Sequence, residues 1–209
     1  MTTTLFTNAH IATGEPGSTA ASTLPLQDIL VTDGVFTAFG PGLAQQYEAQ
    51  GGDLAAIEVV DLGGKLVCPP FCDTHLHLDY VFTARKPGAV NESGTLFEGI
   101  QRWSETKSDL TVDEIKQRAK IGIKKEMLHG VQLIRSHADV TDPNLTSLKA
   151  LLELKEELKD TVTLQIVSFP QEGMYSYEGP HGESGAELVE EGLKMGADCV
   201  GGIPHFEQC

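Results

Sequence analysis

The first 64 residues carry short apolar runs separated by polar and glycine-rich stretches. Two of these runs, 29–31 and 35–39, flank Asp33 and Gly34, a dipeptide typical of a two-residue β-hairpin turn. Further elements are expected as strands near 5–11 and 56–60 and a surface loop over 40–53. The pattern therefore predicts a small N-terminal β-sandwich segment over residues 1–64.

From residue 65 onward, strand-like apolar runs alternate with segments of helical periodicity. The expected strands are 66–68 continuing through 71–78, then 131–137, 162–169 and 199–203. A long polar loop is expected over 79–110, and helices are expected to follow at Thr111, Asp142 and Ser184. Thr111 with Glu114 and Ser184 with Glu187 have the spacing of capping boxes, and Pro143 falls in the first turn of the helix at Asp142. Strands that alternate with helices indicate an α/β fold with a parallel sheet and helical crossovers.

The alternating segment holds four β-α units, and a TIM (β/α)8 barrel has eight over ~250 residues. We therefore interpret residues 65–209 as the first half of a TIM barrel. The alternative is a complete open α/β sheet of four strands. A half-barrel would leave open strand edges and one uncovered face, which favours association, so a homo-oligomer is one expected state.

Composition narrows the classes of partner. The formal net charge is -15, and nucleic-acid binding needs a basic surface. Together with the absence of a long apolar run or a secretory signal pattern, this favours a cytoplasmic protein that binds a small neutral or cationic molecule and neither nucleic acid nor membrane. Cys68 and Cys72 could suggest a zinc knuckle, but prolines between them favour small buried thiols.

The strongest chemical signal lies at residues 71–79, where His75 and His77 are two positions apart. Residues at this spacing on a strand point to the same side. Two imidazoles placed together at the carboxyl end of a barrel strand form half of a divalent-metal site. A histidine pair at this spacing also occurs by chance, so its context decides how much it means.

That context resembles the amidohydrolase superfamily, and within it the bacterial-type cytosine deaminases. The resemblance rests on residues 61–67, 69–71 and 73–77, on 93–100 with Trp103, on 135–140, on 165–173 and on 196–207, in one order and spacing. It implies a β-sandwich before a metal-dependent hydrolase barrel and one divalent metal ion, Fe2+ or Zn2+. Members with two metals carry a bridging lysine at the end of the fourth strand, where residues 201–207 of this chain hold no lysine, so the resemblance implies a single ion.

Site residues follow from the resemblance, position by position. His75 and His77 would be metal ligands, and Gln171 would hydrogen-bond the pyrimidine edge while Leu96 lines the pocket. An amide suits that edge because it offers a donor and an acceptor together. His137 and Asp139 would support and orient the ligands rather than bind the metal.

The resemblance implies hydrolytic deamination of cytosine to uracil and ammonia. Alternatives are another ring, such as isocytosine or an aminotriazine, and a truncated fragment without catalysis. In the family the acid/base carboxylate and the remaining metal ligands lie on later strands, beyond residue 209. The catalytic residues are therefore unknown from this sequence, and we expect the isolated 209-residue chain to be inactive.

Overall fold

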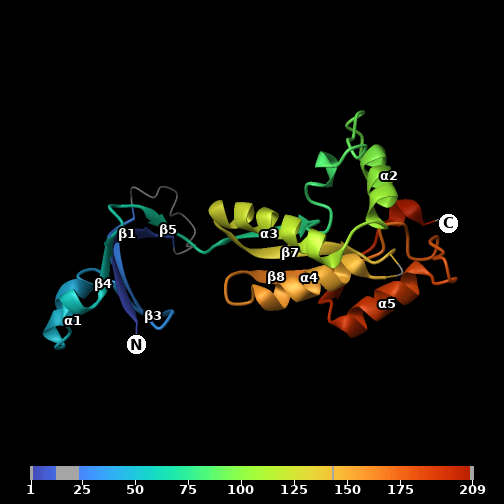
Figure 1. Ribbon diagram of the computed structural model, residues 1–209. Coiled ribbons are helices and arrows are strands. Elements are labelled where there is room, and N and C mark those ends of the chain that lie inside the picture. The colour runs from blue at the N-terminus through green and yellow to red at the C-terminus, as the bar shows by residue number, and fades with distance from the viewer. Residues whose placement is uncertain (1, 13–23, 143, 208–209) are drawn as a thin grey trace. The chain divides into compact units, whose positions relative to one another are not determined.

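The computed structural model describes residues 2–12, 24–142 and 144–207, which form two compact units, Met1–Pro69 and Pro70–Cys209 (Figure 1). The boundary lies between two consecutive prolines, a few residues beyond the change of sequence pattern at residue 65.

The first unit is built on a mixed five-stranded sheet in the order β3-β2-β1-β4, with β5 also paired to β1. Its strands are β1 (Thr3–Ile11), β2 (Leu26–Thr32), β3 (Val35–Gly40), β4 (Glu58–Asp61) and β5 (Leu66–Val67). The expected hairpin between β2 and β3 is confirmed: Asp33 and Gly34 both have positive φ angles, 49° and 77°. Within residues 2–12 and 24–69 the structure holds one sheet, and the second layer of a sandwich stays a prediction.

Three local predictions in this unit differ from the structure in part. The expected loop over 40–53 contains α1 (Leu43–Ala49), and the expected strand at 56–60 begins after a short 3-10 helix, η2 (Leu54–Ala56). At the start of α1 the buried Asp28 carboxylate accepts the Leu43 N–H at 2.9 Å, a contact from 15 positions away that satisfies one free N–H of the first turn. Strand β5, which was expected to begin the first strand of the second unit, pairs instead with β1 of this sheet.

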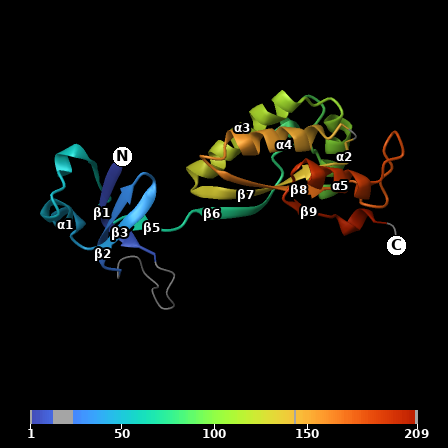
Figure 2. The ribbon, with the colours of Figure 1, turned by 90° about the horizontal axis from the view of Figure 1, so that it is seen from below.

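The second unit confirms the predicted alternation of strands and helices. Its sheet is parallel throughout, in the order β6-β7-β8-β9. The strands are β6 (Phe71–Leu76), β7 (Val131–Asp139), β8 (Thr163–Phe169) and β9 (Cys199–Val200). The helices are α2 (Leu96–Lys107), α3 (Val112–Leu128), α4 (Thr146–Glu157) and α5 (Gly185–Met195), with short 3-10 helices η3 (Thr83–Arg85) and η4 (Pro204–Phe206). Figure 2 shows α3 and α4 on the same side of the strands.

Helix boundaries follow their capping residues. The Thr111 side chain accepts the Glu114 N–H at the start of α3, and Ser184 and Glu187 form the expected capping box at the start of α5. Helix α4 begins at Thr146 and not near Asp142, because Leu145, the residue before it, has a positive φ of 51° that helical backbone does not adopt. The Asp142 carboxylate accepts the Thr146 N–H at 2.8 Å. Pro143 lies outside the described residues.

The predicted loop over 79–110 was wrong in its second half, which is helix α2. The Thr95 side chain accepts the Glu98 N–H and caps this helix. Trp103 is the buried residue of α2: it is 4% exposed and packs into the core. Strand β9 is shorter than expected and ends at Val200. A Cβ atom at the next residue, Gly201, would lie 2.7 Å from the Phe169 ring, so the chain runs against the sheet at that point.

The core of this unit lies between the sheet and its helices. Buried residues on the strands are Ile134, Ser136, Ala138, Leu164 and Ile166, and they meet Ile115, Ala119, Ile123, Leu148, Leu151 and Leu188 on the helices. Helix α5 approaches β8 closely at Gly192, where an added Cβ would meet the Ser168 hydroxyl oxygen at 2.4 Å. The opposite face of the sheet carries a different set of side chains, including the histidines described below.

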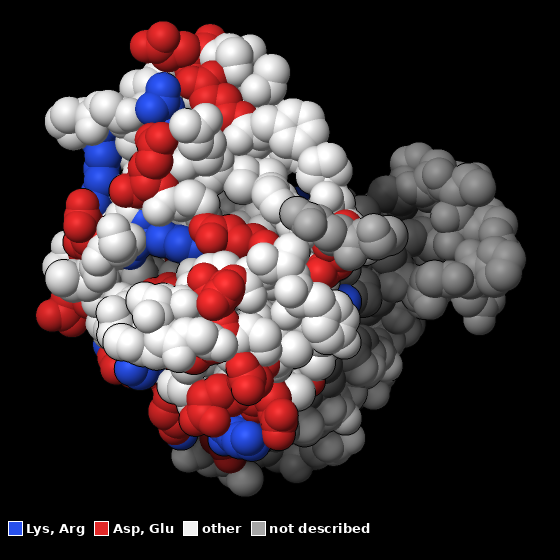
Figure 3. Space-filling view, turned by 90° about the vertical axis from the view of Figure 1, so that its right-hand side faces the viewer, with Lys and Arg blue, Asp and Glu red and all other residues white. Residues whose placement is uncertain are grey.

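The surface departs from expectation at the cysteines. Cys68 and Cys72 are exposed and Cys199 is partly exposed, so the expectation of buried thiols was wrong. Cys72 is exposed because the helices cover only the other face of its strand. On the face in Figure 3, acidic side chains lie among uncharged ones, and the basic side chains form no continuous patch there. In the described part of the chain, no helix has the length and apolar character needed to cross a membrane.

Candidate active site

Three histidines meet where β6 and β7 end. His75 belongs to β6, His77 follows its last residue, and His137 comes from β7. Strand β6 has an irregular register here: Asp73 pairs with Ile134 and Leu76 with Ser136. The ring centroids of His75 and His137 are 4.1 Å apart, and those of His75 and His77 are 5.3 Å apart. One ring nitrogen from each histidine lies within 4.8 Å of those of the other two.

The environment keeps two of these rings neutral. Burial, with the nearby rings of His137 and His75, lowers the pKa of His77 to about 4. Burial and His75 also lower the pKa of His137. A neutral imidazole has a free lone pair, which is the form that binds a metal.

The unused ring atoms fit a metal site. Among the described residues, Nδ1 of His77 and Nδ1 of His137 are buried and have no hydrogen-bond partner. A buried polar atom without a partner is costly, and a bound cation would satisfy it. The donor set of three imidazoles suits a borderline divalent ion such as Zn2+ or Fe2+. The residues present therefore fit the group that the sequence implies.

His137 joins this group more directly than the sequence suggested. Its predicted role was to orient the ligands, whereas its ring nitrogen lies as close to the pair as a ligand would. Only the register of β6 against β7 brings it there, so the spacing of residues along one strand gave no signal for it.

Asp139 contacts none of the histidine rings by a hydrogen bond among those found in the described residues. Its fully buried carboxylate instead accepts from the Trp103 indole N–H at 2.7 Å, from Lys107 Nζ at 3.2 Å and from the backbone N–H and the hydroxyl of Thr141 at 2.8 and 2.6 Å. The backbone N–H of Asp139 in turn donates to Asp79 at 2.9 Å. Burial, with Asp139 nearby, raises the pKa of Asp79 to about 7.

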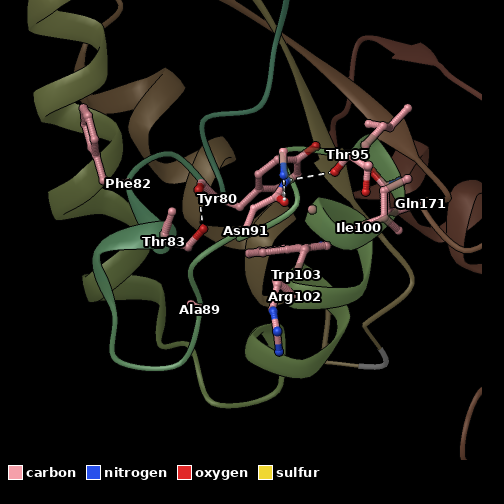
Figure 4. Close-up of a pocket in the computed structure, with 14 residues that line it drawn as sticks. Tyr80, Phe82, Thr83, Ala89, Asn91, Thr95, Ile100, Arg102, Trp103 and Gln171 are labelled. Atoms are coloured by element: carbon pink, nitrogen blue, oxygen red, sulfur yellow. Dashed lines mark hydrogen bonds between the residues drawn. The ribbon is translucent and has the colours of Figure 1, made fainter.

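Both predicted substrate-contacting residues line one pocket of about 540 Å³ (Figure 4). Gln171, which follows β8, is only 3% exposed, and its amide makes no hydrogen bond within the described part of the chain. Leu96 is the first residue of α2 and is 72% exposed. The remaining wall residues are Tyr80, Phe82, Thr83, Ala84, Ala89, Asn91, Gly94, Thr95, Gly99, Ile100, Arg102 and Trp103.

Tyr80 connects the pocket to the histidines. Its ring stacks on His77 with centroids 4.5 Å apart, and it lies 4.6 Å from the ring of Trp103. Burial raises the pKa of Tyr80 above its usual value, so its hydroxyl stays protonated. Sequence reasoning missed Tyr80 as a site residue, although it directly follows the motif that carries the histidine pair.

Comparisons with known proteins agree on one family. The model of the family described as "Amidohydrolase family" matches residues 58–208. A curated relative, N-isopropylammelide isopropyl amidohydrolase from Pseudomonas sp. (strain ADP), is 35% identical over 148 residues, which are 69% of this chain and 36% of that protein. Pterin deaminase from Rhizobium rhizogenes is 27% identical over 152 residues, 70% of this chain and 32% of that protein.

Among solved structures, 5-methylcytosine deaminase from Klebsiella pneumoniae liganded with 5-fluorocytosine is similar at a TM-score of 0.79 and 41% identity. The match covers 98% of this chain and 44% of that one. The chain thus spans about a third of the curated relatives' length and less than half of this structure's.

Proposed function

The chain belongs to the amidohydrolase family, and from this we propose that it supplies the first metal ligands and the ring-binding wall of a metal-dependent hydrolase that deaminates cytosine or a close ring analogue. One observation carries the proposal: three histidine nitrogens converge within 4.8 Å, next to a pocket whose wall includes Gln171, which is 3% exposed.

His75 and His77 would hold the metal, with His137 either as a third ligand or as their support. A divalent ion bound there, Fe2+ or Zn2+, would supply Lewis-acid activation of the attacking water. The lowered pKa values of His77 and His137 support this assignment because both rings stay neutral near pH 7.

Gln171 would form hydrogen bonds with the edge of the ring. Its side chain is 3% exposed and lines the pocket, and its amide can donate and accept toward adjacent N–H, C=O or ring nitrogen groups. Tyr80 and Trp103 offer aromatic faces in the same pocket, while Leu96 lines its wall at the start of α2. A flat, polar-edged heterocycle satisfies both kinds of contact.

The acid/base group would come from outside the histidine cluster. In the described part of the chain, the side chains whose ligand atoms meet there include no carboxylate. We assign Pro70–Cys209 to the first four β-α units of an eight-unit barrel, supported by a match that covers 98% of this chain but 44% of a similar structure. The 209 residues alone are then expected to bind ring and metal without turnover.

A ring other than cytosine is the second candidate. The curated relative that is 35% identical has N-isopropylammelide in its name, while the similar solved structure contains 5-fluorocytosine. Because Gln171 matches any ring with an amide-like edge, a binding series with both compounds discriminates between the candidates.

The metal part is tested by titrating Zn2+ or Fe2+ into the purified chain. We expect about one ion per chain, and His75→Ala or His77→Ala should weaken binding by at least about 10-fold, the loss that removing even a supporting partner can cause. His129→Ala is the matched control, because His129 ends α3 and contacts Lys125 instead of the cluster. Equal weakening in all three variants would contradict the assignment.

Ring binding can be measured by quenching of Trp103, the single tryptophan of the chain. We expect 5-fluorocytosine to quench it, and Gln171→Ala to weaken that binding about 10-fold through the loss of hydrogen bonds. Gln165→Ala is the control, since Gln165 lies outside the pocket and pairs with Arg135. Unchanged affinity in Gln171→Ala would remove this residue from ring recognition.

A further inference from the structure

One largely buried lysine meets three acceptors from two segments of the second unit, the end of β7 and the loop after β8. Lys107 is the last residue of α2, and its side chain is 11% exposed. Its ammonium lies 3.2 Å from Asp139 Oδ2, 3.0 Å from Thr141 Oγ1 and 2.6 Å from Glu172 Oε1. An ammonium has three N–H donors, so these three acceptors match its donor capacity.

The three acceptors sit beside the walls of the ring pocket. Asp139 ends β7 and also accepts the indole N–H of Trp103, through the same oxygen that Lys107 contacts. Glu172 directly follows Gln171, and it also accepts from the Ser104 hydroxyl of α2 at 2.6 Å. Lys107 therefore joins the helix that carries Trp103 to the loop that carries Gln171.

The charge of Lys107 is maintained by these partners. Burial by itself lowers the pKa of a lysine, but Asp139 and Glu172 outweigh it and raise the pKa of Lys107. The ammonium thus stays charged at neutral pH. Removing it would leave the fully buried Asp139 carboxylate without its cation, and an uncompensated buried charge forces its surroundings to rearrange.

We propose that Lys107 is a positioning residue for ring recognition: it fixes Trp103 and the Gln171 loop relative to each other so that both face the same ligand. The identity of the ring rests on the proposed function. The link from Lys107 to Trp103 rests on the hydrogen bonds alone, and it is testable without any ligand.

A matched control exists on the next helix. Lys116 of α3 is 14% exposed and also joins two carboxylates, Glu153 at 2.6 Å and Glu157 at 2.5 Å on α4. It lines no part of the ring pocket. Lys107→Met and Lys116→Met therefore each remove an ammonium that joins two carboxylates, one beside the pocket and one away from it, although the partners of Lys116 are more exposed than Asp139.

The experiment measures Trp103 emission and acrylamide quenching, then 5-fluorocytosine affinity, in the 209-residue chain. Circular dichroism confirms that each variant folds. We expect Lys107→Met to shift the emission, increase quencher access and weaken 5-fluorocytosine binding about 10-fold, the scale of a lost hydrogen bond to a charged group. Lys116→Met should leave all three at their original values. Glu172→Gln, which keeps the side-chain shape, should produce a smaller change in the same direction and replaces Lys107→Met if that variant does not fold.

Unchanged Trp103 signals and ring affinity in the folded Lys107 or Glu172 variant would overturn the inference. Equal changes in Lys116→Met would also overturn it, because they would indicate general loosening. The original chain could bind no 5-fluorocytosine while Lys107→Met, and not Lys116→Met, alters the emission and quenching of Trp103. In that case the proposed ring is wrong, and the positioning of Trp103 by Lys107 is supported.

Discussion

The two faces of the β6–β9 sheet are built from alternate residues of the same strands, yet they differ in almost every property. On one face, Ile134, Ala138 and Ile166 are at most 2% exposed and pack against the helices. On the other, Arg135 pairs with Gln165, and His137 meets the histidines of β6. The first face is mainly apolar, whereas the second combines these polar side chains with the buried Val167 and Phe169, although neighbouring residues differ by one position.

This contrast separates stability from chemistry within one sheet. Apolar side chains under the helices lower the free energy of the folded state by leaving water. The buried histidine His77 has a different effect: burial lowers its pKa, because the charged form of the ring is less favourable in the folded protein than in water. A change on one face should therefore affect folding, and a change on the other should affect binding.

The largest expected effect comes from the covered face. Ile166→Ala removes a fully buried side chain and leaves a cavity, which should reduce the free energy of unfolding by about 2–5 kcal/mol. Urea denaturation followed by circular dichroism measures this. Metal affinity of the folded fraction should remain within error, and a large loss of affinity at low temperature would show that the two faces are not separable.

A smaller effect concerns protonation on the histidine face. In the metal-free chain, the NMR signals of the His77 ring should titrate with a midpoint near pH 4 instead of the ordinary 6.5. Since the folded state binds this proton less readily than the unfolded state, His77 contributes stability above pH 6.5 that is lost as the pH falls toward 4.

Stability curves alone would not isolate this effect. The raised pKa of Asp79, about 7, acts in the opposite direction, because its contribution is present at low pH and is lost as the pH rises toward 7. The direct titration of the ring therefore decides the matter. A midpoint above pH 6 would contradict the burial of His77.

The smallest effect is expected at the exposed part of the same face. Arg135→Met removes the 2.5 Å contact between Arg135 Nε and Gln165 Oε1, and the free energy of unfolding should change by no more than about 0.5 kcal/mol. Because the Arg135 charge helps lower the pKa of His137, its loss should strengthen metal binding by less than about 1 kcal/mol. Calorimetric titration measures the second value, and weaker binding would contradict it.

Much of the fold followed from local patterns. The hairpin at Asp33 and Gly34 and the caps at Thr111 and Ser184 were predictable because a few adjacent residues decide each of them. Helix α1 was not, since its start depends on the distant carboxylate of Asp28. The buried thiols were expected wrongly because Cys72 lies on the face that the helices do not cover.

For the site, the sequence by itself pointed to the pair His75 and His77, because residues two apart on a strand share a side, and in the structure His75 lies on β6 and His77 just after its end. It also pointed to Gln171 and Leu96 through the resemblance to a family, and the structure places both in one pocket. These site positions can be predicted from the sequence because they depend on neighbouring residues or belong to recognisable motifs.

Only the tertiary structure decided which residues His137 and Lys107 contact. His137 reaches the pair through the register of β6 against β7, although it lies 60 positions after His77 and 62 after His75 in the chain. Lys107 meets partners from β7 and from the loop after β8. Each depends on strand pairing and helix packing between distant segments, and local periodicity carries no information about those contacts.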